Sequence, residues 1–266
     1  MRKNQKGNNK AKEILQQIGF DEVTELSMKD LLAGFDVIYI EEELNGSDGV
    51  IIRGKSKTII KVDINISTLQ RKRFVAAHEL GHFFLHDKLE FHLDDEKTLS
   101  WNRLEEVHKR GIQEIEANDF AGELLMPEQV FRDFITRKPF CPDLIKELSE
   151  RFNTSLTSVI FRMLSLEIAP FFVVFMADGV VRYWRKTKDF KCYTNDITKI
   201  PPPEFSVAKE YIDSNYEFIY EGTEKTQSIE KSTWFKLNDW EEDIEFNEYC
   251  LPTKKYKTLI SVIWEA

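Results

Sequence analysis

Residues 71–87 read RKRFVAAHELGHFFLHD and contain His78, Glu79 and His82 in the spacing H-E-x-x-H. The stretch has helical periodicity and no proline. Residues four apart on an α-helix lie on one face about one turn apart, so His78 and His82 can present imidazole nitrogens to one metal ion. Glu79 then lies at the edge of that face, where a general base for an activated water has to be. The spacing therefore predicts a catalytic metal site.

Apolar side chains surround this motif almost continuously, which predicts a helix buried on most sides. They are Phe74, Val75, Ala76, Ala77, Leu80, Phe83, Phe84 and Leu85. Burying unpaired ionisable groups is costly, so the two histidines and the glutamate need a partner there. Gly81 costs about 1 kcal/mol of helix stability relative to alanine, which suggests that a strand or a substrate packs closely at this position.

The metal requires a further ligand, because catalytic zinc takes three protein ligands and keeps one position open. The extended pattern H-E-x-x-H-x-x-G-x-x-H is absent, since Leu85 and Lys88 stand where it needs glycine and histidine. His86 lies one turn further along the same helix and is expected to pack or bond behind the ligands rather than reach the ion. The third ligand must then come from another segment.

The segment QEIEANDFAGELLMP, residues 113–127, supplies candidate carboxylates on a second helix with an apolar stripe. Glu116 and Asp119 are three residues apart and share a face, with Asn118 near it. Glu116 as ligand, with Asp119 or Asn118 as hydrogen-bond partner of a ligating histidine, gives the usual arrangement of a zinc site.

Glu114 and Glu123 are the competing carboxylates in that segment, and for Glu114 a solvated helix face is the favoured interpretation. All five histidines of the chain fall between residues 78 and 108, as a site would require. His92 and His108, in the polar stretch after the first helix, are candidates for stabilising the oxyanion of peptide hydrolysis.

The two motifs together resemble the ImmA/IrrE family of bacterial and phage metallopeptidases. The resemblance rests on RFVAAHELGHFFLH and, some thirty residues later, EIEANDFAGELLMP, and it covers about residues 10–168. It implies a gluzincin-like zinc peptidase with one Zn²⁺ per chain, held by His78, His82 and Glu116, and with Glu79 as catalytic base. It further implies a cytoplasmic endopeptidase that cleaves a helix-turn-helix repressor and so switches on a mobile element or a stress response.

Composition agrees with a cytoplasmic protein. The 266 residues carry a net charge of -9, which disfavours nucleic acid as a direct partner. Cys141, Cys192 and Cys250 lie far apart and in no metal-binding spacing, as expected in a reducing compartment. The polar start of the chain lacks the apolar stretch of a signal peptide, and no membrane association is expected.

The pattern along the chain predicts an α+β protein with four parts. Residues 1–10 are expected to be a disordered tail, and residues 11–140 a zincin-like, mainly helical peptidase domain with a small sheet. Residues 141–168 read as a helix-turn-helix-like hairpin. Residues 169–266 read as a mainly β region, whose regulatory or sensor-like role is an expectation from the family alone.

Two of these parts carry more specific expectations. Strands are predicted within residues 35–66, and the strand before the H-E-x-x-H helix could pair with an extended peptide or simply pack on that helix. The second helix of the hairpin exposes serine and threonine with Arg162 as its one cation, so packing against the peptidase domain is favoured over reading DNA.

A regulatory protein that keeps zinc without cutting is the main alternative to a peptidase. Both hypotheses predict bound zinc and differ on Glu79, because a non-catalytic site has no need of a carboxylate beside an open coordination position. The presence of Glu79 within an otherwise apolar helix favours the enzyme.

Overall fold

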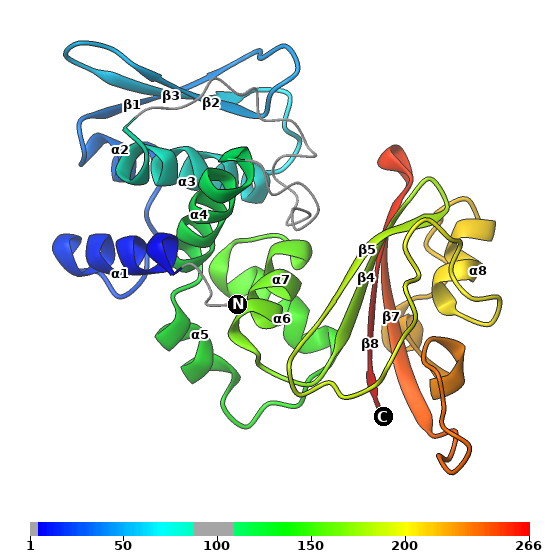
Figure 1. The fold of residues 1–266 in the computed structure, drawn as a ribbon. Coiled ribbons are helices and arrows are strands. Elements are labelled where there is room, and N and C mark those ends of the chain that lie inside the picture. Colours follow the sequence, from blue (N-terminus) through cyan, green and yellow to red (C-terminus); the bar gives the residue numbers. More distant parts are fainter. Residues whose placement is uncertain (1–4, 88–108) are drawn as a thin grey trace. The chain divides into compact units, whose positions relative to one another are not determined.

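The computed structural model describes residues 5–87 and 109–266 (Figure 1). Contacts divide the chain into two compact units, residues 1–139 with 144–162 and residues 140–143 with 163–266. The first unit is mainly helical with a three-stranded sheet, and the second is built on a five-stranded sheet. The predicted α+β class is confirmed. The division falls inside the last helix of the predicted hairpin rather than at residue 168.

The first unit and the hairpin contain seven described helices and three described strands. In chain order they are α1 (Lys6–Ile18), α2 (Met28–Ala33), β1 (Val37–Glu42), β2 (Gly49–Arg53), β3 (Thr58–Asp63), α3 (Leu69–Leu85), α4 (Lys109–Leu125), α5 (Glu128–Ile135), α6 (Pro142–Phe152) and α7 (Leu156–Leu166).

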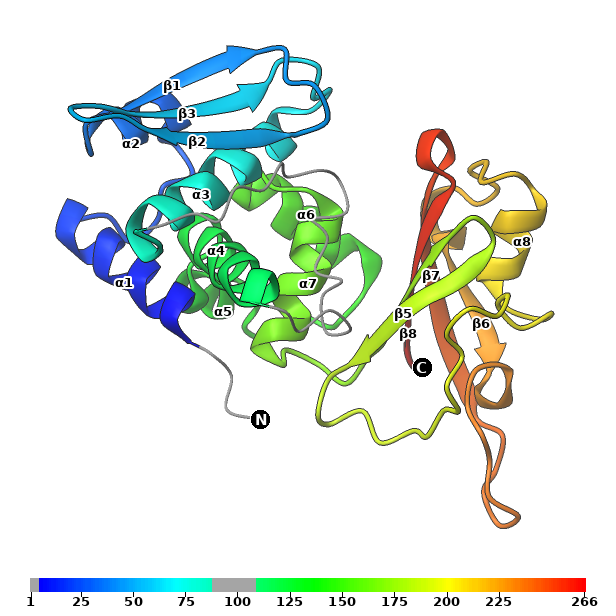
Figure 2. The same ribbon diagram turned by 45° about the horizontal axis from the view of Figure 1, so that its top comes forward.

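The small sheet has the order β1-β3-β2 and lies over α3 (Figure 2). β1 runs parallel to β3, whereas β2 is antiparallel to it. β3 immediately precedes α3 but is the central strand, so the strand predicted to pair with a peptide has both edges occupied. Among the described strands, β2 and β1 are the edges of this sheet, and β2 also contacts α3. β3 also ends earlier than expected, because the side chain of Asp63 accepts from the Asn65 N–H and turns the chain, leaving Ile64 53% exposed.

Helix α3 is buried over ten consecutive residues, Arg73–His82, as its apolar sequence predicts. It begins at Thr68, whose side chain accepts from the Arg71 N–H. At its other end the Arg53 guanidinium donates to the backbone oxygens of His82 and His86, at 2.8 and 2.6 Å. A cation at a helix C-terminus is favourable because the carbonyl oxygens there carry partial negative charge.

Gly81 marks a close approach of α3 and α4. A Cβ added to Gly81 would lie 3.1 Å from the Ala117 Cα and 3.2 Å from the Ala117 oxygen. The expected close packing is therefore present, but its partner is a helix rather than a strand or a substrate. This contact brings the faces of α3 and α4 together at the level of His82.

Residues 6–10 are helical, contrary to the prediction of a disordered tail, and form the first turns of α1. Two features order it: Ala11, Ile14 and Leu15 are buried, and Gly7 lies so close to α4 that an added Cβ would meet the backbone of Glu116. Residues 1–4 lie outside the described residues.

Arg162 of α7 is not exposed, contrary to the sequence expectation. Its side chain is 2% exposed, pairs with the equally buried Glu123 of α4, and donates from Nε to the Met126 oxygen at 3.0 Å. α6 is attached to the same unit through Phe152, whose ring stacks on Phe131 at 5.6 Å. These contacts agree with the predicted packing of the hairpin on the first unit.

The second unit is a fully antiparallel sheet in the order β5-β4-β8-β7-β6 with one helix. Its elements are β4 (Phe172–Ala177), β5 (Val180–Lys186), α8 (Val207–Asp213), β6 (Thr226–Glu230), β7 (Glu245–Thr253) and β8 (Thr258–Glu265), with short 3-10 turns at Gly222–Lys225, Lys231–Thr233 and Lys254–Tyr256. The sequence predicts five short β-type runs here, at residues 171–175, 180–184, 218–220, 234–237 and 259–264, and the first two and the last correspond to strands β4, β5 and β8. The runs 218–220 and 234–237 are not strands, and α8 was not predicted.

Glu248 joins α8 to this sheet. Its fully buried carboxylate accepts from the backbone N–H groups of Val207 and Ala208, from Trp234 Nε1 and from Ser261 Oγ, at 2.6–3.2 Å. Burial raises the pKa of Glu248, and these hydrogen bonds oppose the rise. Within the described parts of the chain, no helix is long and apolar enough to cross a membrane.

Candidate metal centre

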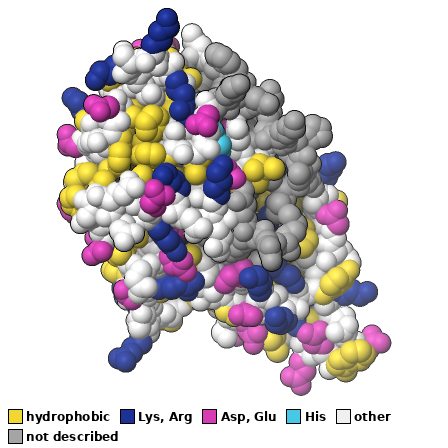
Figure 3. All heavy atoms as spheres, turned by 60° about the vertical axis from the view of Figure 1, so that its left-hand side comes forward, with side chains coloured by type: hydrophobic (Ala, Val, Ile, Leu, Met, Phe, Trp, Pro, Cys, Tyr) yellow, Lys and Arg dark blue, Asp and Glu magenta, His cyan; other side chains and the backbone are white. Residues whose placement is uncertain are grey.

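Three buried side chains from two helices converge at the centre of the first unit. His78 and His82, one turn apart on α3, place their Nε2 atoms 3.0 Å from each other. Glu114 of α4 places Oε2 3.2 Å from His78 Nε2 and Oε1 3.5 Å from His82 Nε2. The three residues are 0–3% exposed. Little histidine surface is visible in Figure 3, where basic and acidic side chains are interspersed.

This donor set fits a zinc ion by chemistry and by spacing. Two imidazoles and one carboxylate form one of the ligand sets that zinc takes in catalytic sites. A tetrahedral ion with bonds of about 2.0–2.1 Å holds its ligand atoms about 3.3 Å apart. The two Nε2 atoms are 3.0 Å apart, and each lies 3.2 or 3.5 Å from a different oxygen of the Glu114 carboxylate, which is around that value. His78, His82 and Glu114 could therefore hold one zinc ion.

Glu114, rather than the predicted Glu116, is the carboxylate beside the histidine pair. The expectation of a solvated Glu114 is wrong, since the residue is 3% exposed. The reason is helical geometry: Glu114 and Asn118 are four residues apart and share a face, and Asn118 Oδ1 lies 2.9 Å from His78 Nδ1. Glu116 lies about 200° away from Glu114 around the helix. The i, i+4 pairing of Glu114 with Asn118 was the signal in the sequence that could have identified it.

Glu116 lies beside His86 instead. His86 Nε2 is 3.0 Å from Glu116 Oε2, and His86 Nδ1 is 2.9 Å from His82 Nδ1. Lys6 of α1 also donates to Glu116 Oε2, at 3.0 Å, a contact that the sequence did not suggest. His86 thus lies behind a histidine of the pair.

The remaining candidates take other positions or cannot be placed. Asp119 is half-buried, and its Cβ lies 3.0 Å from the position of a Cβ built on Gly7 of α1. Glu123 pairs with Arg162, as described above. The two oxyanion candidates, His92 and His108, lie outside the described residues.

Glu79 lies next to the first residue of the edge strand β2. A Cβ built on Gly49 would lie 3.1 Å from Glu79 Oε1 and 2.5 Å from Val75 Cγ1, so glycine allows the strand to approach the helix here. Glu79 is 2% exposed. The carboxylate that follows His78 therefore lies against the start of β2.

The site favours an ionised Glu114 carboxylate and a neutral His86 imidazole. Burial raises the pKa of Glu114, but its hydrogen bonds and charge interactions with His78 and His82 outweigh burial and leave that pKa well below its usual range. Burial lowers the pKa of His86, although its hydrogen bond to Glu116 acts in the opposite direction. An ionised Glu114 and neutral histidines are the forms that bind a metal.

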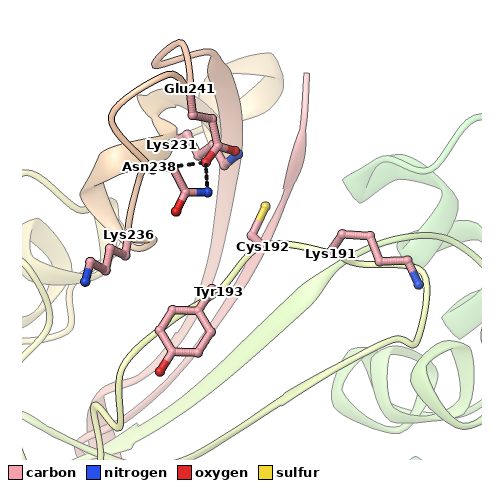
Figure 4. A pocket seen from close by; sticks show the side chains of 7 residues that line it. All are labelled: Lys191, Cys192, Tyr193, Lys231, Lys236, Asn238 and Glu241. Atoms are coloured by element: carbon pink, nitrogen blue, oxygen red, sulfur yellow. Dashed lines mark hydrogen bonds and ion pairs between the residues drawn. The ribbon is translucent and has the colours of Figure 1, made fainter.

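The second unit has a separate depression of about 270 Å³ (Figure 4). Its lining residues are Lys191, Cys192, Tyr193, Lys231, Lys236, Asn238 and Glu241. Lys231 pairs with Glu241, and burial raises the pKa of the Cys192 thiol, which keeps it protonated and weakly nucleophilic. This depression therefore offers no activated thiol.

The fold and site define a class: an α+β protein with an H-E-x-x-H helix whose histidines meet a glutamate from a second buried helix. Residues 34–164 match the family model Peptidase_M78, described as the IrrE N-terminal-like domain. These findings confirm the resemblance to the ImmA/IrrE family that the two motifs carry.

Two relatives extend the comparison. Metallopeptidase ImmA of Bacillus subtilis (strain 168) is 30% identical over 118 residues, which are 44% of this chain and 63% of that protein. This chain therefore aligns with less than two thirds of that relative. A solved structure titled Mycobacterium tuberculosis transcriptional regulator aligns with a TM-score of 0.61 over 97% of this chain and 87% of that chain. At 13% sequence identity, it shows a shared fold.

Proposed function

We propose that this protein is a zinc-dependent endopeptidase with His78, His82 and Glu114 as metal ligands and Glu79 as general base. The observation that carries the proposal is the buried convergence of the two Nε2 atoms with the Glu114 carboxylate, with Glu79 directly after His78 on the same helix. The match to a metallopeptidase family supports it.

The reaction divides between the metal and this chain's own groups. When bound, zinc supplies Lewis-acid activation of a water molecule, which can then lose a proton near neutral pH. The Glu79 carboxylate accepts that proton as the water oxygen attacks the scissile carbonyl carbon. Glu79 then delivers the proton to the amine nitrogen as the C–N bond breaks, giving a new carboxyl group and a new amine.

The edge strand β2 is the proposed binding surface for the substrate backbone. A peptide in extended conformation can add to a free sheet edge through main-chain hydrogen bonds. Among the described strands, β2 lies at an edge of the sheet, and its first residue, Gly49, lies against Glu79. A peptide paired there would pass close to the proposed base.

The proposed substrate is a helix-turn-helix repressor in the cytoplasm, whose cleavage derepresses a mobile element or a stress response. The support is the family resemblance and the net charge of -9, which would speed association with a basic DNA-binding partner. The three cysteines are free thiols, which suits a reducing compartment. A regulatory role for the second unit remains a prediction.

Metal content and cleavage, measured together, test the proposal against the alternative of a non-catalytic zinc protein. The variants are Glu79→Gln and, as a matched surface control, Glu147→Gln, whose side chain is 51% exposed. We expect about one zinc per chain in wild type and in both variants. We expect a candidate helix-turn-helix repressor to be cleaved by wild type and by Glu147→Gln, and not by Glu79→Gln. Zinc in all three with cleavage by none favours the alternative. Absence of zinc from wild type would contradict the metal site itself.

A further inference from the structure

Four side chains, His82, His86, Glu116 and Lys6, form a continuous series of polar contacts from the proposed metal site to the N-terminal helix α1. His82 Nδ1 lies 2.9 Å from His86 Nδ1, and His86 Nε2 lies 3.0 Å from Glu116 Oε2. Lys6 Nζ completes it at 3.0 Å from the same carboxylate oxygen. His82, His86 and Glu116 are 3–5% exposed, so solvent does not take the place of these partners.

The positions of donors and acceptors fix the direction of the hydrogen bonds in this series of side chains. A His82 that offers its Nε2 lone pair to a metal carries its proton on Nδ1. His86 Nδ1 must then accept, which places the His86 proton on Nε2, facing Glu116. The Glu116 carboxylate accepts from both His86 and Lys6. With a neutral His86, each contact thus has one donor and one acceptor only when His82 Nε2 is free for the metal.

Lys6 also stabilises the end of the helix that carries both histidines. Its ammonium donates to the Leu85 backbone oxygen at 3.2 Å, next to His86. α1 is held against α4 at this point by the close contact of Gly7 with the Glu116 backbone. Lys6 precedes residues 34–164, the part that the family model covers. Lys6 therefore contacts the proposed metal site from outside the region that the family model matches.

We propose that Lys6 and Glu116 are positioning residues of the metal centre, which act through His86 to hold His82 in the tautomer and orientation that bind metal. The inference rests on the proposed metal site. Partners that orient a ligating histidine typically contribute about 10–100-fold in metal affinity. The N-terminal helix is, on this basis, part of the metal-binding apparatus.

The test is the zinc affinity of the full chain, measured by competition with a chelator, together with the visible spectrum of the Co²⁺-loaded protein. The variants are His86→Phe, Glu116→Gln and Lys6→Met. Lys12→Met is the matched control, because Lys12 lies on the same helix, is 50% exposed against 52% for Lys6, and also pairs with a glutamate at 3.0 Å. Circular dichroism checks that each variant is folded.

We expect His86→Phe and Glu116→Gln to weaken zinc binding by about 10–100-fold and to change the Co²⁺ spectrum. Lys6→Met, one contact further away, should weaken it by about 2–10-fold, and Lys12→Met should leave affinity and spectrum unchanged. Equal affinity and an equal spectrum for wild type and His86→Phe would overturn the inference while leaving the metal site intact. Equal effects of Lys6→Met and Lys12→Met would remove Lys6 from it. A wild-type protein that binds no zinc would overturn both proposals.

Discussion

Replacing Arg162 by methionine should destabilise the first unit strongly and leave the second unit unchanged. Arg162 and Glu123 are each 2% exposed, so the substitution leaves the buried Glu123 carboxylate with Lys12 Nζ, at 4.0 Å, in place of its close pairing with Arg162. It also removes the hydrogen bond to the Met126 oxygen. Breaking a buried pair by removing one partner typically costs about 3–5 kcal/mol, because the remaining charge is uncompensated. We expect a loss of about that size.

Urea unfolding with two probes resolves the effect. Most described helices lie in the first unit, so far-ultraviolet circular dichroism follows that unit, whereas four of the five tryptophans lie between residues 184 and 264 and report on the second. With a slope of about 2 kcal/mol per molar urea, the dichroism midpoint should fall by about 1.5–2.5 M. The tryptophan midpoint should stay constant.

Two further variants make the comparison decisive. Arg132→Met removes an exposed pair with Glu128, worth about 0.3–0.5 kcal/mol, and serves as the control. Glu123→Leu combined with Arg162→Met removes both buried charges, at the cost of the bond from the Glu128 N–H to Glu123. The double variant should lose about 2 kcal/mol or less. A midpoint for Arg162→Met equal to that of Arg132→Met would refute the reasoning.

Three other outcomes follow from the same contacts. Glu114→Gln should abolish tight zinc binding, whereas Glu116→Gln should only weaken it, and a chelator titration in which Glu116→Gln loses more than Glu114→Gln would reverse the ligand assignment. Gly81→Val should cost about 1–3 kcal/mol in urea unfolding, because atoms of α4 lie 3.1 Å from the added Cβ; an unchanged midpoint would contradict the close helix contact. Burial raises the pKa of Tyr211 and of Tyr249 to about 12, so the stability these residues contribute is present below about pH 10 and is lost as pH rises through 12. Ultraviolet titration of tyrosinate should show this delay, and ionisation of all tyrosines near pH 10 in the folded protein would exclude it.

Short-range patterns predicted a large part of the first unit. The burial of α3, the strands around Ile60 and Val62, and the helix with Ala117 and Phe120 all follow from side-chain periodicity, which depends on neighbours a few residues away. The second unit was less predictable. Its strands β6 and β7 and helix α8 carry mixed polar sequences, and their order depends on pairing partners distant in the chain, such as Glu248 with the start of α8.

The sequence alone determined the arrangement of His78, Glu79 and His82, because the geometry of one helix is local: residues four apart share a face whatever surrounds them. The choice of Glu114 over Glu116, the role of His86 and the contact of Lys6 with the site depend on how α4 and α1 are rotated against α3. That rotation is set by close contacts at Gly81 and Gly7 between segments far apart in the chain. Only the tertiary structure decides it, since each helix by itself presents several carboxylates on different faces and packing selects the one that meets the histidines.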